Sequence, residues 1–270
     1  MKPARFDYAS PGSLDDAVSL LQSNANAKIM AGAQTLGPML NLRLVQPELI
    51  VDITRIPDLV RVEETDDGTL YGACVTHAAI EDGRVPDGSD GALRQVARGI
   101  AYRAVRTRGT IGGSLAHADP AADWLSALTA LGAEVVVYSS KGRRTIPVAQ
   151  LMTWVFETAL KTAEILEAVR VPRLSSTARF GYYKICRKTG EFAEAIGSVL
   201  LDSETKTMRA VVGATNAAPL VMEDATPFRR GSELDSGAIK AHLKNNGIID
   251  AYELQLHTIA LARAATQVIA

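Results

Sequence analysis

A glycine-bearing run near the middle of the chain, Thr-Ile-Gly-Gly-Ser at residues 110–114, constrains the fold more than any other feature. Adjacent glycines permit left-handed backbone angles and weaken a helix, so residues 107–114 are predicted not to form a regular helix. A second loop, Ala-Gly-Ala-Gln-Thr-Leu-Gly at 31–37, follows a short apolar run at 28–31. Small residues let backbone N–H groups approach an anion closely, and the hydroxyl and amide side chains add further donors.

Taken alone, each loop is more simply interpreted as a tight turn. The G-x-G-x-x-G fingerprint is absent, and Gly37 is followed by Pro38 rather than by the Lys-Ser/Thr of a Walker A motif. Two loops of this kind can together grip a pyrophosphate. A diphosphate-containing ligand held between them is therefore the functional hypothesis.

Capping residues and hydrophobic patterning predict a mixture of helices and strands. Ser13 to Asp16 reads as a capping box, and Asp119-Pro120 as the start of a helix that ends before Gly132. A polar segment at 172–177 predicts a boundary near residue 175, and the class is α+β. The other predicted elements are a helix from Ser13 to about Gln22, strands at 28–31, 49–51, 133–138, 165–171, 180–186, 196–201 and 208–213, a hairpin at 59–75, and helices at 90–99, 235–245 and 252–269.

Composition limits the chemistry that the chain can carry. It has 270 residues, a net charge of -1 and only two cysteines, Cys74 and Cys186, and its four histidines show no metal-binding spacing. Iron–sulfur clusters need four ligands each, so we expect no metal site; the near-neutral charge also argues against a nucleic-acid surface. No apolar run suits a membrane span or a signal peptide, so a cytoplasmic location is expected. Redox chemistry would need an organic cofactor or a metal-bearing partner.

Five segments then carry a resemblance to a known family: 31–44, 72–77, 110–123, 162–172 and 181–193. In this order they resemble the FAD-binding subunits of the xanthine dehydrogenase and carbon monoxide dehydrogenase family of molybdenum hydroxylases. The resemblance covers nearly the whole chain. It implies an FAD-binding fold of the PCMH and vanillyl-alcohol-oxidase type, with two α/β subdomains at 1–55 and 56–175 and a C-terminal α+β domain at 178–270.

The resemblance also implies how FAD is held, without a covalent bond. The two loops hold the pyrophosphate, Asp123 lies near the ribityl or adenosine part, and Leu166 lines the adenine side. Lys184 approaches the flavin, and Phe192 covers one face of its ring. The full set of expected FAD-binding residues is Met30, Ala31, Gly32, Ala33, Gln34, Thr35, Leu36, His77, Ile100, Thr110, Gly112, Gly113, Ser114, His117, Asp123, Leu166, Lys184 and Phe192. One departure is Ala33, which stands where the family commonly has glycine.

No side chain is assigned a catalytic role. His77 is favoured as a structural histidine near the loops, whereas His117 is expected to form a hydrogen bond near FAD. Asp119 is expected only to cap its helix, and the two cysteines to lie in the core. Three arginines before the second loop are expected on a solvated face, with a cationic rim facing phosphate or a partner as the alternative: Arg103, Arg106 and Arg108.

The implied function is electron transfer within a larger enzyme. In this family a large subunit carries molybdopterin, a small subunit carries two [2Fe–2S] clusters, and the FAD subunit passes electrons to an external acceptor. Two clusters need about eight cysteine ligands, far more than this chain has. We expect a dimer of heterotrimers. The segment 252–257 favours an N-heteroaromatic substrate for the holoenzyme, while the acceptor stays open. The alternatives are a stand-alone PCMH-type flavin oxidoreductase and a cofactor-free binding protein.

Overall fold

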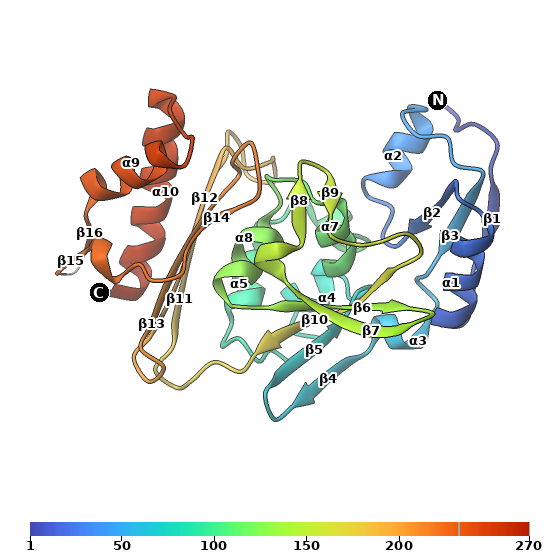
Figure 1. The fold of residues 1–270 in the computed structure, drawn as a ribbon, viewed down its shortest axis with the longest axis horizontal. Coiled ribbons are helices and arrows are strands. Elements are labelled where there is room, and N and C mark those ends of the chain that lie inside the picture. Colours follow the sequence, from blue (N-terminus) through green and yellow to red (C-terminus); the bar gives the residue numbers. More distant parts are fainter. Residues whose placement is uncertain (232, 270) are drawn as a thin grey trace.

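Three main sheets lie side by side along the molecule in the computed structural model, which describes residues 1–231 and 233–269 (Figure 1). Two further sheets, β8-β9 and β15-β16, have two strands each. A small sheet lies at the N-terminal end, a five-stranded sheet with several short helices lies in the middle, and a four-stranded sheet backed by a long helix lies at the C-terminal end. The predicted α+β class is confirmed.

The N-terminal sheet has three parallel strands in the order β1-β3-β2. Ser13 caps the helix between the first two strands, because its Oγ accepts a hydrogen bond from Asp16 N at 3.1 Å, as predicted. The elements are β1 (Asp7–Ala9), α1 (Leu14–Ser23), β2 (Ala27–Met30), α2 (Leu36–Asn41) and β3 (Leu49–Asp52).

The middle sheet has the order β4-β5-β10-β6-β7, and every pairing in it is antiparallel. Among the subdomains expected to be α/β, only the first therefore has a parallel sheet. The elements are α3 (Pro57–Val60), β4 (Val62–Thr65), β5 (Gly68–Gly72), α4 (His77–Glu81), α5 (Ala92–Gly99), α6 (Arg103–Arg106), α7 (Ile111–His117), α8 (Asp123–Ala130), β6 (Glu134–Ser139), β7 (Gly142–Pro147), η1 (Val148–Gln150), β8 (Met152–Trp154), β9 (Glu157–Thr158) and β10 (Ile165–Pro172).

The C-terminal sheet, in the order β11-β12-β13-β14, is packed between α10 and α8. A Cβ at Gly197 would lie 2.4 Å from Ala260 O, so glycine lets α10 approach the sheet closely. The elements are β11 (Arg179–Ile185), β12 (Ala195–Asp202), β13 (Thr207–Gly213), β14 (Leu220–Met222), η2 (Thr226–Phe228), β15 (Arg229–Arg230), β16 (Glu233–Leu234), α9 (Ser236–Asn245) and α10 (Ala251–Ile269). The proposed domain boundaries stay a prediction.

The helix expected from Asp119 begins later, at Asp123. Asp119 does not cap it; its Oδ1 accepts a hydrogen bond from Ala121 N at 2.9 Å, and its carbonyl accepts from Ala122 N. Ala118, with φ +51°, ends the preceding helix in a left-handed conformation. The Asp-Pro pair therefore forms a turn between two helices, since the chain must reverse there.

The segment that favoured an N-heteroaromatic substrate lies within α10, at residues 252–257. Leu254 and His257 are buried in the C-terminal core, against the four-stranded sheet. Tyr252, by contrast, is 65% exposed near the start of α10, so only part of this segment packs against the core.

Candidate functional site

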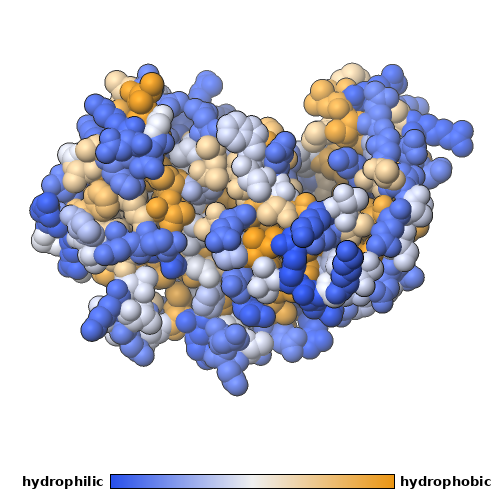
Figure 2. Space-filling view, viewed as in Figure 1, coloured by the Kyte–Doolittle hydropathy of each residue, from blue (hydrophilic) through white to orange (hydrophobic). Residues whose placement is uncertain are grey.

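The two glycine-bearing loops, about 75 residues apart in sequence, meet in space. A Cβ at Gly32 would lie only 1.9 Å from Arg108 O, and one at Gly113 would lie 3.6 Å from Ala31 Cβ. Figure 2 shows the surface hollowed between the part that carries α2 and the part that carries β8 and β9. The loops thus form one site between the N-terminal and middle sheets.

The first loop presents free backbone donors. The N–H groups of Ala33, Gln34 and Thr35 find no acceptor among the described residues, and Thr35 begins α2 without a side-chain cap. Ala33 has φ +59°, a left-handed conformation that suits the glycine common in the family. The Gln34 amide, expected to be an extra donor, donates to Gly32 O at 3.1 Å. Backbone groups and the Thr35 hydroxyl therefore supply the donors here.

The second loop is the first turn of α7, so the prediction that no helix forms across Gly112 and Gly113 is wrong. Neither glycine has a positive φ. Gly112 is needed for close packing, since its Cβ would lie 2.4 Å from Ala73 Cβ. Thr110 starts the helix, and its Oγ1 accepts from Gly113 N at 3.1 Å. Glycine destabilises a helix, but Gly112 is needed at this position because a side chain would not fit against Ala73.

Gly113 and Ser114 are the half-buried residues of this turn, on the side of the first loop. Gly113 has no side chain to cover its backbone, and a Cβ there would lie 2.7 Å from Thr110 Oγ1, the group that caps this turn.

His77 is a structural histidine, as favoured from the sequence. It is 4% exposed, and its Nδ1 accepts a hydrogen bond from Trp124 Nε1 at 3.1 Å. Its backbone N–H donates to Gly109 O at 2.9 Å, and a Cβ at Gly109 would lie 2.9 Å from the ring. Burial lowers its pKa to about 4, with a smaller contribution from Arg106. His77 thus packs, as a neutral ring, against Gly109 at the start of the second loop.

His117 ends α7 and is half-buried. Its ring lies 5.0 Å from the ring of Phe156, which is 58% exposed. Burial lowers the pKa of His117, and the carboxylate of Asp119 opposes that shift. This histidine lies at the far end of the helix from Thr110.

Asp123 and Lys184 form a buried ion pair across the boundary with the C-terminal sheet. Lys184 Nζ lies 2.8 Å from Asp123 Oδ1 and donates to Gly99 O at 2.6 Å. The Tyr182 hydroxyl also donates to Asp123 Oδ1, at 2.6 Å. Burial, followed by the charge of Asp123, raises the pKa of Tyr182 well above its usual value. The structure thus brings Asp123 and Lys184 together, and Tyr182 is a partner that the sequence did not reveal.

Four more residues of the expected FAD-binding set lie in different surroundings. Met30 ends β2 beside the first loop, and Ile100 follows Gly99 directly. Leu166 is 5% exposed on β10 and belongs to the main core. Phe192 is 75% exposed in the loop between β11 and β12. That loop touches the Ile100 segment, because a Cβ at Gly190 would lie 2.7 Å from Tyr102 Cε1.

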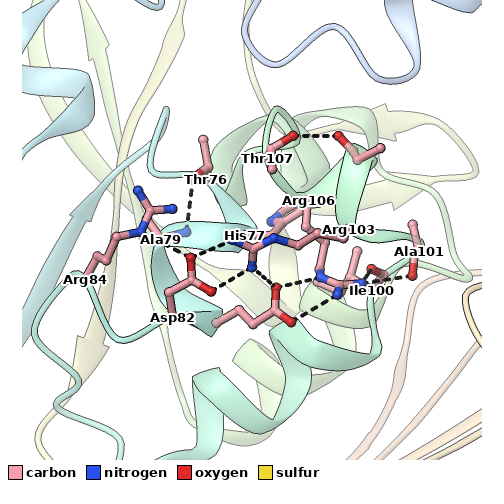
Figure 3. Close-up of polar contacts among 12 residues, drawn as sticks. Thr76, His77, Ala79, Asp82, Arg84, Ile100, Ala101, Arg103, Arg106 and Thr107 are labelled. Atoms are coloured by element: carbon pink, nitrogen blue, oxygen red, sulfur yellow. Dashed lines mark hydrogen bonds and ion pairs between the residues drawn. The ribbon is translucent and has the colours of Figure 1, made fainter.

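The expectation of a solvated face is wrong for Arg106. Its side chain is 12% exposed and donates to both carboxylate oxygens of Glu81, at 2.8 and 3.0 Å. It also donates to the carbonyls of Ile100 and Ala101 (Figure 3). Arg103, 49% exposed, and Arg108 lie toward solvent as predicted.

A long ligand with a diphosphate is what the paired loops fit. The family model described as the FAD binding domain in molybdopterin dehydrogenase matches residues 4–174. The chain therefore belongs to the family of FAD-binding domains of molybdopterin dehydrogenases, which confirms the sequence resemblance and FAD as the cofactor. It is an FAD-binding medium subunit of the molybdenum hydroxylase type, an oxidoreductase component.

Relatives and solved structures agree with this assignment. The nicotine 6-hydroxylase medium subunit of Paenarthrobacter nicotinovorans is 37% identical over 87% of this chain and 83% of its own length. Carbon monoxide dehydrogenase from Hydrogenophaga pseudoflava, in a form that lacks the Mo-pyranopterin moiety, matches with a TM-score of 0.88 at 30% identity, covering 99% of this chain and 98% of its own. Quinoline 2-oxidoreductase from Pseudomonas putida 86 matches at 0.88 and 28%, covering 100% and 98%.

Two further observations concern metals and membranes. Within residues 1–231 and 233–269, no group of three or more His, Cys, Asp or Glu side chains is placed to hold a metal ion. None of the helices in this described part is long and apolar enough to cross a bilayer.

Proposed function

We propose that this chain binds FAD non-covalently and serves as the electron-transfer subunit of a multi-subunit molybdenum hydroxylase. The observation that carries the proposal is the meeting of the two loops, with free backbone donors on one side and bare glycine backbone on the other. FAD would supply the redox chemistry that such a subunit needs between the [2Fe–2S] clusters of a partner and an external acceptor.

Several residues of the chain are suited to hold the cofactor. The N–H groups of Ala33 to Thr35, with the hydroxyls of Thr35 and Ser114, would bind the pyrophosphate. Lys184, held by Asp123 and Gly99 O, would approach the flavin part. Leu166 would lie on the adenine side. No side chain is given a proton-transfer role, since His77 is buried and already accepts a bond from Trp124.

The partners we propose are a large molybdopterin subunit and a small [2Fe–2S] subunit, assembled as a dimer of heterotrimers in the cytoplasm. Eight cluster ligands cannot come from Cys74 and Cys186. The relatives whose names include "medium subunit" or "medium chain" support this division of labour.

The substrate we propose for the holoenzyme is an N-heteroaromatic compound. The names of two similar proteins, which refer to nicotine and quinoline, support this substrate class. Carbon monoxide dehydrogenases are also among the relatives, so assays of the purified complex with an N-heteroaromatic compound and with carbon monoxide test the substrate class.

A stand-alone flavin oxidoreductase is the alternative function. Such an enzyme needs a substrate site of its own beside the flavin. Purification from the native host through a tag on this chain separates the two. Co-purified large and small subunits, with bound flavin reduced when substrate is added to the complex, would support the proposal. A lone yellow chain that turns over a substrate would favour the alternative.

A further inference from the structure

We propose that Arg106 is a positioning residue, whose single guanidinium couples the pyrophosphate-binding turn to the segment that holds Lys184. The inference rests on the proposed binding of FAD. Arg106 lies in α6, outside both loops, and has no place in the expected set of FAD-binding residues.

One edge of the guanidinium bonds to Glu81 and so links α4 to the chain that leads into the second loop. Arg106 holds Glu81, at the end of α4, through a bidentate pair. At the start of the same helix, His77 N donates to Gly109 O at 2.9 Å, and Gly109 N donates back to Val105 O at 2.7 Å. These hydrogen bonds therefore join α4, Arg106 and the residues just before Thr110 in a closed set of contacts. Its geometry fixes where α7 begins.

The other side of the guanidinium holds the segment 99–102. Its Nη1 donates to Ile100 O at 2.9 Å and to Ala101 O at 3.0 Å. Ala101 has φ +41°, a left-handed conformation that alanine disfavours, so these bonds help to maintain a strained backbone. The neighbouring Gly99 O accepts from Lys184 Nζ at 2.6 Å. A shift of this segment would therefore move the ammonium group of Lys184.

This arrangement requires arginine. A planar guanidinium can bind both oxygens of a carboxylate along one edge and carbonyl oxygens along another, whereas the ammonium of lysine is a single point with a shorter reach. Loss of one set of contacts would release either the loop or the Lys184 segment. Arg103, on the same helix, is half exposed. Among the described residues it bonds to Glu81 and Asp82 and to no carbonyl of the segment 99–102, so Arg103→Lys is a control that shares the Glu81 contact but leaves that segment held.

The test compares FAD binding by the full-length wild-type chain, Arg106→Lys and Arg103→Lys. The apparent Kd for FAD is measured by flavin fluorescence quenching, and the shape of the visible flavin bands and the flavin midpoint potential are recorded at saturation. We expect Arg106→Lys to raise the Kd about tenfold or more, the equivalent of losing one or two charge-assisted hydrogen bonds. Its flavin spectrum should also shift toward that of free FAD. Arg103→Lys should match the wild type in all three measurements.

Glu81→Gln provides a second variant if Arg106→Lys fails to fold, because it weakens the same pair while keeping the side-chain shape. It should change the Kd and the spectrum in the same direction by a smaller factor. A folded Arg106→Lys or Glu81→Gln chain with a lower melting temperature, but unchanged Kd, spectrum and potential, would overturn the positioning role. If the wild-type chain binds FAD while these variants give unchanged values, the proposed function still stands. A wild-type chain that binds no FAD would overturn both.

Discussion

Lys184 and Asp123 form an ion pair of 2.8 Å between β11 and α8, with only 9% and 10% of their side chains exposed. The pair joins the C-terminal sheet to the middle of the molecule, beside the segment that we expect to face the flavin. Tyr182 donates to the same carboxylate oxygen, which satisfies the buried charge further. A buried charge is tolerated only when it is paired, so this joint has to form correctly for the two parts to pack.

Removal of one partner should therefore be costly. Lys184→Met would leave the Asp123 carboxylate buried with only the tyrosine hydroxyl, and we expect a loss of about 3 kcal/mol or more in the free energy of unfolding. Denaturant unfolding of the purified chain measures it. Lys161→Met, at an exposed lysine, is the control and should change little. A loss below about 1 kcal/mol for Lys184→Met would show that the pair is exposed in solution.

Gly113→Trp should abolish FAD retention while the fold survives. The surface over Gly113 is the bare backbone of the α7 turn beside Ala31, so a large side chain would occupy the space that the pyrophosphate needs. The flavin-to-protein ratio after gel filtration is the measurement. Gly12→Trp is a matched control, since no atom lies within 4 Å of its Cβ position. Normal flavin content in the Gly113 variant would contradict the placement of the pyrophosphate.

Ala33→Gly should stabilise the chain and leave FAD binding equal or tighter. Ala33 adopts φ +59°, where an alanine methyl is strained and glycine is not. We expect a gain of about 1 kcal/mol in the free energy of unfolding. Thermal unfolding without FAD measures the gain. A loss of stability would mean that residue 33 takes a right-handed conformation in solution.

Stability should fall in mild acid because of two buried histidines. Burial lowers the pKa of His77 and of His257 to about 4, against 6.5 for the free side chain, and His257 Nδ1 has no hydrogen-bond partner among the described residues. The neutral ring is favoured in the folded state, whereas the unfolded chain takes up a proton below pH 6.5. The contribution to stability is therefore complete above that pH and is lost as pH falls toward 4.

Each histidine should cost on the order of 2 kcal/mol between pH 7 and pH 5. His257→Leu removes one of the two titrating groups, so urea unfolding of this variant should depend less on pH than that of the wild type. Equal pH dependence in the two proteins would show that His257 is accessible to protons in the folded state.

The sequence allowed much of the fold to be predicted, because the regular elements follow local rules. Ser13 caps α1 through Asp16 N as its spacing indicates. Gly112 shows where such rules end. Its pair with Gly113 indicated a loop, but the close approach of Ala73, a residue distant in the chain, explains the glycine within a helix.

The sequence indicated the two loops of the candidate site but not the residues that hold them in place. The loop residues carry recognisable small-residue patterns, whereas Arg106 and Tyr182 act through partners far away in sequence, Glu81 and Asp123. Arginine on a short helix is usually solvated, so only the fold shows that Arg106 is buried. Asp119 was assigned as a helix cap because Asp-Pro is a common helix start, but the turn after Ala118 uses it instead.

Native mass spectrometry of the purified chain, compared with mass spectrometry of the same protein under denaturing conditions, shows whether the chain holds FAD and whether the bond is covalent. We expect one FAD per chain in the native spectrum, and the bare 28.8 kDa chain together with released FAD after denaturation. A flavin that remains attached after denaturation would contradict non-covalent binding. A chain that carries no flavin, even after incubation with FAD, would contradict the assignment of the two loops as its binding site.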